Sequence, residues 1–223
     1  MKKQTAKLLI LFAIFKNSTF GTIRKSIGDD VAYQLGGQNI IRKKPVSVND
    51  ANTTKQQARR TALKRLVNVY RHIQSVVKAG FVQRLAKHSA YNAFMHENLK
   101  NAVILAGANA TINYPALKVA KGSMPAISLG ASPTISGNTL SVTLNNVSDN
   151  NLITDNDKQV IVVLSDDNPD RFVTAEFPAT ATGSHDIDVS NFDSGVDLRV
   201  YLFAKSSDGQ KTSDSSFVGT VTN

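Results

Sequence analysis

Cysteine and tryptophan are absent from the 223 residues of this chain, and no long hydrophobic run is present. The lack of cysteine excludes disulfide bonds, thiolate metal sites and cysteine catalysis. The apolar run near the N-terminus, Leu8–Phe15, has 8 residues, whereas a helix that crosses a bilayer needs about 20. We therefore do not expect a membrane partner.

The N-terminus superficially resembles a signal peptide, because Lys2 and Lys3 precede the apolar run. Lys16 closes the run and no clear small-x-small cleavage site follows, which is atypical of an export signal. The alternative interpretation of the run is a buried strand or an assembly arm. We favour this second interpretation over export.

Acidic residues are scarce in the first half of the chain. Residues 1–122 carry 21 Lys and Arg against 4 Asp and Glu, a net charge of +17, while residues 123–223 carry 5 against 13, a net charge of −8. This asymmetry has two interpretations. The basic half binds a polyanion such as DNA, or copies of the chain meet head-to-tail with basic halves against acidic ones.

A long basic helix is predicted over residues 53–80. Its apolar side chains recur at steps of three and four, which places them on one face that must be buried. They are Leu63, Leu66, Tyr70, Ile73 and Val77. Thr53 and Gln56 match a capping box, in which each side chain satisfies a backbone N–H at the helix start. Gly80 ends the pattern.

The segments around this helix complete a small basic α+β domain over residues 1–122. Alternating apolar residues on both sides of Gly36 and Gly37 predict a hairpin over about residues 30–43, and Pro45 ends its second strand. A second helix is predicted over about residues 89–105. An extended segment over residues 110–122 then leads out of the domain.

The second half of the chain changes to short apolar alternations between Gly, Asn, Asp and Ser clusters. Strands are predicted near residues 124–130, 139–145, 159–164, 171–177, 185–189, 196–205 and 216–222. Seven short strands in about 100 residues fit an immunoglobulin-like or fibronectin type III-like sandwich. The predicted fold class is therefore α+β, with a hairpin and two-helix domain at residues 1–122 and an acidic all-β sandwich at residues 123–223, each with its own core.

The polar residues contain no recognisable catalytic or metal-binding pattern. The histidines, His72, His88, His96 and His185, lack the spacing of a metal pair or of a catalytic triad. The Asp- and Asn-rich clusters at residues 155–157 and 166–170 lack the spacing of a calcium-binding loop and are typical of turns. The glycine-rich pieces match no nucleotide-binding motif. We predict no metal, no cofactor, no small-molecule substrate and no enzymatic activity.

One set of cations departs from expectation, at the exit of the predicted hairpin and along the predicted helix. It comprises Arg42, Lys43, Lys44, Lys55, Arg59, Arg60, Lys64, Arg65 and Arg71. Cations that meet phosphates release counterions, so this set would bind DNA without sequence preference at low salt. Aromatic residues do not interleave with it and no groove-reading motif is present. A solvated helix face or a protein contact is an equal alternative.

Four segments of the first half, taken in order, carry a family resemblance. They read GTIRKSIGDDVAYQLGGQNIIRKKPVSV, TTKQQARRTALKRLVNVYRHIQSVVKAGF, SAYNAFMHENLKNAV and INYPALKVAKGSMP. This order resembles an uncharacterised family of Bacteroidota proteins, a domain of unknown function that also occurs in crAss-like phages and mobile elements. The resemblance implies that a β-sandwich follows, and it implies no enzyme.

The resemblance and the charge distribution lead to three hypotheses. The first is a noncatalytic structural subunit of a phage virion, a neck, tail or ring component that binds copies of itself and other virion proteins. It implies a location in the virion, or in the host cytoplasm before assembly. The second is a nucleic-acid-binding protein of a phage or mobile element without sequence preference. The third is an exported surface adhesin.

Overall fold

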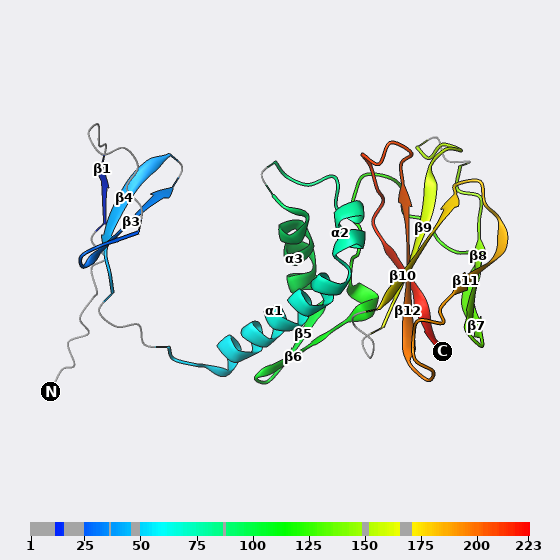
Figure 1. Cartoon of the computed structure of the whole chain (residues 1–223), viewed down its shortest axis with the longest axis horizontal. Helices are drawn as coiled ribbons and strands as arrows, with labels where there is room; N and C mark the ends of the chain where they lie inside the picture. Colours follow the sequence, from blue (N-terminus) through cyan, green and yellow to red (C-terminus); the bar gives the residue numbers. More distant parts are fainter. Residues whose placement is uncertain are drawn as a thin grey trace. The chain divides into compact units, whose positions relative to one another are not determined.

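The computed structural model of the chain describes residues 12–15, 25–35, 37–45, 50–86, 88–148, 152–165 and 171–223. They belong to two compact units, Met1–Ala51 and Asn52–Asn223, whose elements are labelled in Figure 1. This division does not coincide with the predicted domains 1–122 and 123–223. The helices of the predicted first domain instead share a hydrophobic core with strands of the predicted second one.

The smaller unit holds an antiparallel sheet of four strands in the order β1-β4-β3-β2. Its strands are β1 (Phe12–Phe15), β2 (Lys25–Ile27), β3 (Asp30–Leu35) and β4 (Gln38–Lys43). The predicted hairpin is confirmed as β3 and β4, and Gly37 supplies the positive φ of +82° that its turn requires. Residues 12–15 of the N-terminal apolar run form β1, which pairs with β4.

The larger unit begins with three helices, α1 (Thr54–His72), α2 (Gln74–Gly80) and α3 (Ala90–Asn101). The predicted capping box is confirmed at the start of α1. The Thr53 hydroxyl accepts a hydrogen bond from the Gln56 N–H at 3.3 Å, and the Gln56 side chain accepts one from the Thr53 N–H at 2.9 Å. The single helix predicted over residues 53–80 is divided at Ile73, whose φ of −104° and ψ of 25° depart from helical geometry.

The second helix ends earlier than predicted, because residues 103–112 form a hairpin. Its strands are β5 (Val103–Ala106) and β6 (Asn109–Ile112), and Gly107 has a φ of +59° in the turn between them. The predicted extended segment over residues 110–122 thus begins as a strand. It continues into the short 3-10 helix η1 (Tyr114–Ala116).

Seven strands in two antiparallel sheets form the β-rich part of the larger unit, so the predicted α+β class is confirmed. They are β7 (Ala131–Ser136), β8 (Thr139–Leu144), β9 (Lys158–Leu164), β10 (Phe172–Pro178), β11 (Gly183–Asp188), β12 (Asp197–Lys205) and β13 (Ser216–Thr222). One sheet has the order β10-β9-β12-β13 and the other β11-β8-β7. The first predicted strand, near residues 124–130, is wrong: there only Met124 forms an isolated bridge, to Ser213.

The two central strands of the four-stranded sheet, β9 and β12, are buried on both faces. One face packs against the three-stranded sheet through side chains such as Ile161, Leu198 and Leu202. The opposite face joins the core of the helices, and its contributors are Val160, Val162, Leu164, Tyr201 and Phe203. In Figure 1 the helices accordingly lie beside this sheet, on the side away from β7 and β8. The expectation of a separate core for residues 1–122 and for residues 123–223 therefore needs correction, because one sheet serves two cores.

Candidate binding groove beside the basic helix

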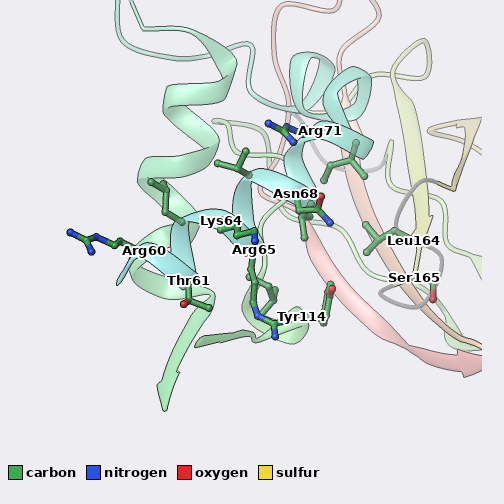
Figure 2. A pocket seen from close by; sticks show the side chains of 14 residues that line it. Arg60, Thr61, Lys64, Arg65, Asn68, Arg71, Tyr114, Leu164 and Ser165 are labelled. Atoms are coloured by element: carbon green, nitrogen blue, oxygen red, sulfur yellow. The ribbon is translucent and has the colours of Figure 1, made fainter. Parts of the chain in front are cut away.

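A groove of about 740 Å³ lies between α1 and the carboxyl end of β9 (Figure 2). Hairpin β5–β6 contributes Ile112 to its lining, and η1 contributes Tyr114. In Figure 2, Arg60, Lys64 and Asn68 follow one another along α1, while Leu164 and Ser165 lie on the other side of the groove. The groove thus joins surfaces from both predicted halves of the chain.

The floor of this groove is apolar and well packed. Ile73, Tyr114 and Leu164 are only 2%, 6% and 4% exposed, and all three belong to the core between the helices and the sheet. Val67 and Ile112 are half-buried and pack against the same core. Because the floor is part of a core, its shape is fixed before any partner arrives.

The rim of the groove is basic. Arg60, Lys64, Arg65 and Arg71 line it, and all four are exposed residues of α1. Arg60, Lys64 and Arg71 are separated by four and seven residues, so the helical repeat places them on one stripe. This stripe lies opposite Ala58, Ala62 and Leu66, the residues that α1 buries. An apolar floor with a cationic rim suits a partner that carries both apolar side chains and negative charge.

The buried face of α1 differs from the predicted stripe. Leu66, Ile73 and Val77 are buried as expected, but Leu63 is 45% exposed. Ala58 and Ala62 take part in the buried face instead. Their small side chains allow a close approach to hairpin β5–β6, and the Thr61 hydroxyl donates to the carbonyl of Ala108 in its turn. The hairpin was not predicted, so this choice of face could not be derived.

Tyr114 is held in the floor by contacts to β12. The Tyr201 hydroxyl donates a hydrogen bond of 2.8 Å to the Tyr114 carbonyl, and the Arg199 guanidinium lies 4.0 Å from the centroid of the Tyr114 ring. Burial raises the pKa of the Tyr201 phenol far above its ordinary value. The phenol therefore stays protonated and keeps donating this bond throughout the neutral range.

Lys64, Arg65 and Arg71 take part in none of the ion pairs within the described parts of the chain. The ion pairs found there join Lys121 to Glu97, Arg171 to Asp193, and both Lys158 and Lys205 to Glu176. These three cations give the rim a positive charge, which favours an acidic partner.

The match to a family model covers nearly the whole chain. A model described as a family of unknown function (DUF6266) matches residues 21–219. The chain belongs to this family. The expectation of an uncharacterised family is confirmed, and the match extends over the β-rich part as well as the helices. No curated protein matches the chain.

The predicted cation set of this DUF6266 chain is divided between the two compact units. Arg60, Lys64, Arg65 and Arg71 come together at the groove. Lys55 and Arg59 are exposed on α1 outside the lining. The remaining three, Arg42, Lys43 and Lys44, belong to the smaller unit, at the end of β4.

Sequence reasoning missed the apolar floor of the groove. Leu164 and Tyr114 were not predicted as groove residues, although one feature of the sequence indicates that the strand of Leu164 is covered on both faces. Residues 159–164, QVIVVL, form a nearly continuous apolar run, which is typical of a strand buried on both faces. Such a strand requires a second covering layer, and the basic helix was the available one.

Among the residues that the structure describes, no cluster of His, Asp and Glu is arranged to hold a metal ion. In the same parts of the chain, no helix has the length and apolar character needed to cross a membrane.

Proposed function

We propose that the protein is a noncatalytic structural subunit of a Bacteroidota phage particle, a neck, tail or ring component that assembles head-to-tail. The observation that carries the proposal is the preformed groove, whose basic rim belongs to a chain that is acidic over residues 123–223. Each copy offers one surface of each sign, so a second copy is a complementary partner. The phage context is supported by the family resemblance of the first half.

The proposal predicts self-association that salt weakens. Sedimentation velocity of the full chain at rising concentration should show species larger than a monomer at low salt, and these should dissociate at high salt. Mass spectrometry of purified Bacteroidota phage particles should find the protein in many copies. A chain that stays monomeric at every salt concentration and is absent from particles would end the proposal.

A second candidate function is binding to nucleic acid without sequence preference. The stripe of Arg60, Lys64 and Arg71 favours it, because cations along one helix face can follow a phosphate backbone. Four phosphate contacts would weaken binding on the order of 100-fold between 50 and 200 mM salt. Duplex DNA that competes with self-association would place both partners at the groove, whereas no measurable DNA binding at low salt would remove this candidate.

We also assign the two β-sheets to the immunoglobulin-like class. The first, second and fifth strands of the seven pair in one sheet, and the third, fourth, sixth and seventh in the other. This order places the fourth strand beside the third, as variable-type immunoglobulin domains do. Such domains commonly serve as binding or assembly modules, but the class alone fixes no activity.

A further inference from the structure

We infer that the groove beside α1 binds the loop that precedes β9 in a neighbouring copy of the chain. Leu152 of that loop packs against the apolar floor, and Asp155 with the nearby Asp208 meets the cations of the rim. The inference rests on the proposed head-to-tail assembly and names the two surfaces that carry it.

The loop before β9 presents an apolar side chain beside carboxylates. Leu152 is 69% exposed, and Asp155 is exposed three residues later. One exposed leucine alone is ordinary on a protein surface. Here the leucine lies beside carboxylates at one end of the sheets. The groove has an apolar floor that fits the leucine and a cationic rim that fits the carboxylates.

A buried carboxylate fixes the shape of this acidic end. Asp157, only 5% exposed, accepts a hydrogen bond of 2.8 Å from the Thr154 N–H and another of 2.8 Å from the Ser207 N–H. The second bond ties the loop before β9 to the turn after β12, which carries Asp208. The two acidic segments are therefore held together before binding, which lowers the entropic cost of association.

The carboxylates at this end outnumber the lysines by one, with Asp155, Asp157, Asp208 and Glu176 against Lys158, Lys205 and Lys211. Hydrogen bonds from the Ser206 hydroxyl and the Gln210 N–H lower the pKa of Asp208, so it is ionised at neutral pH. Lys158 and Lys205 are both engaged by Glu176. Lys211 is exposed and interacts electrostatically with Asp208, so it opposes the attraction of a basic groove.

The positions of the two surfaces make the contact intermolecular. The acidic loop ends at Asp157, just before β9 starts, whereas the groove is lined by Leu164 and Ser165 at the other end of β9. A strand of 7 residues spans about 23 Å. A chain therefore cannot fill its own groove with this loop. Repetition of the same contact produces a closed ring or an open filament.

The test mixes two variants that are each defective in one surface. The loop variant carries Leu152→Ser and Asp155→Asn, and the groove variant carries Lys64→Gln and Arg71→Gln, so neither altered surface gains a charge that would attract the other. Each alone should need at least about tenfold more protein to assemble than the wild type. Mixed in equal amounts, they should form a dimer that grows no further, because only one intact loop and one intact groove remain. Sedimentation velocity distinguishes this dimer from monomers and from longer assemblies.

A matched control separates this contact from general charge effects. Asp186→Asn makes the same charge change as Asp155→Asn at an exposed position of β11, keeps an acceptor for the Ser141 hydroxyl, and should leave assembly unaltered, while Lys211→Glu should strengthen it. All the altered positions are exposed, and circular dichroism checks that the variants are folded. Wild-type assembly that persists in the loop variant, or is lost in Asp186→Asn, overturns the inference while the proposed function survives. A wild-type chain that never self-associates overturns the inference too, and it ends the proposed function when the protein is also absent from phage particles.

Discussion

The Tyr201 hydroxyl donates a 2.8 Å hydrogen bond to the carbonyl of Tyr114, which joins the middle of β12 to the floor of the groove. Both residues are buried, so water cannot replace either partner. Tyr201→Phe should therefore lower the free energy of unfolding by about 1–3 kcal/mol, the cost of leaving a buried carbonyl without a donor. Chemical denaturation of the full chain measures this. A variant as stable as the wild type would show that the bond contributes nothing.

The same phenol predicts a dependence of stability on alkaline pH. Burial raises the pKa of Tyr201 above its ordinary value of 10.0. Above that pH the unfolded chain loses this proton while the folded chain keeps it, so stability is full below about pH 10 and falls by up to 1.4 kcal/mol per pH unit above it. The stability difference between the wild type and Tyr201→Phe should shrink over this range. A constant difference between pH 9 and 11 would contradict the prediction.

The close packing around Gly80, at the end of α2, leads us to predict that a larger residue there destabilises the fold. A Cβ at this position would collide with the carbonyl of Val119 and with Ala120, whose backbone passes directly over the glycine. Gly80→Ala should lower the free energy of unfolding by about 1–3 kcal/mol, although alanine is the better helix former. Thermal unfolding measures the loss. Ser75→Ala, at an exposed position of the same helix, is the control and should be neutral or slightly stabilising.

The buried amide of Asn98 leads us to predict that Asn98→Asp, although nearly isosteric, destabilises the fold. Its fully buried side chain donates to the Lys118 carbonyl at 2.9 Å and accepts from the Lys118 N–H at 2.7 Å. Asn98→Asp keeps the shape but places a buried carboxylate against that carbonyl. We expect a loss of several kcal/mol at neutral pH, since burial of an unpaired charge is costly, with partial recovery in acid as the carboxyl becomes protonated. Equal loss at both pH values would indicate that packing alone matters.

The sharing of one sheet by two cores predicts how fragments behave. A fragment of residues 123–223 would expose Val162, Tyr201 and Phe203, which the helices cover in the full chain. It should aggregate or unfold without cooperativity, whereas residues 52–223 should unfold in one cooperative transition. Circular dichroism with denaturant compares the two. A soluble, cooperative fragment 123–223 would support the predicted boundary at residue 122 instead.

Local signals in the sequence were sufficient for much of the fold. The capping box of Thr53 and Gln56, the hairpin around Gly37 and most strands of the second half depend on neighbouring residues, and they were predicted near their true places. The division at Ile73 and the hairpin after Asn101 were missed, because apolar periodicity alone does not mark a short break or distinguish a helix end from a strand.

The candidate site was only half predictable. Helical spacing identifies the cations of α1, since Arg60, Lys64 and Arg71 share a face in any straight helix. The floor that accompanies them comes from Tyr114 and Leu164, which are distant in sequence and meet only through the packing of helices on β9 and β12. No local pattern encodes that meeting. The groove is lined by residues from both the basic half and the acidic half of the chain, so treating the two halves as separate domains could not predict it.

The sheet with two covered faces also sets the order in which the chain can fold during synthesis. The helices leave the ribosome before this sheet, and β12 follows α2 only about 120 residues later. At typical elongation rates this is a delay of roughly 6–24 s. Until β9 and then β12 emerge, the apolar faces of the helices lack the strands that cover them. The set of buried side chains that forms this core is complete only when Phe203 has emerged.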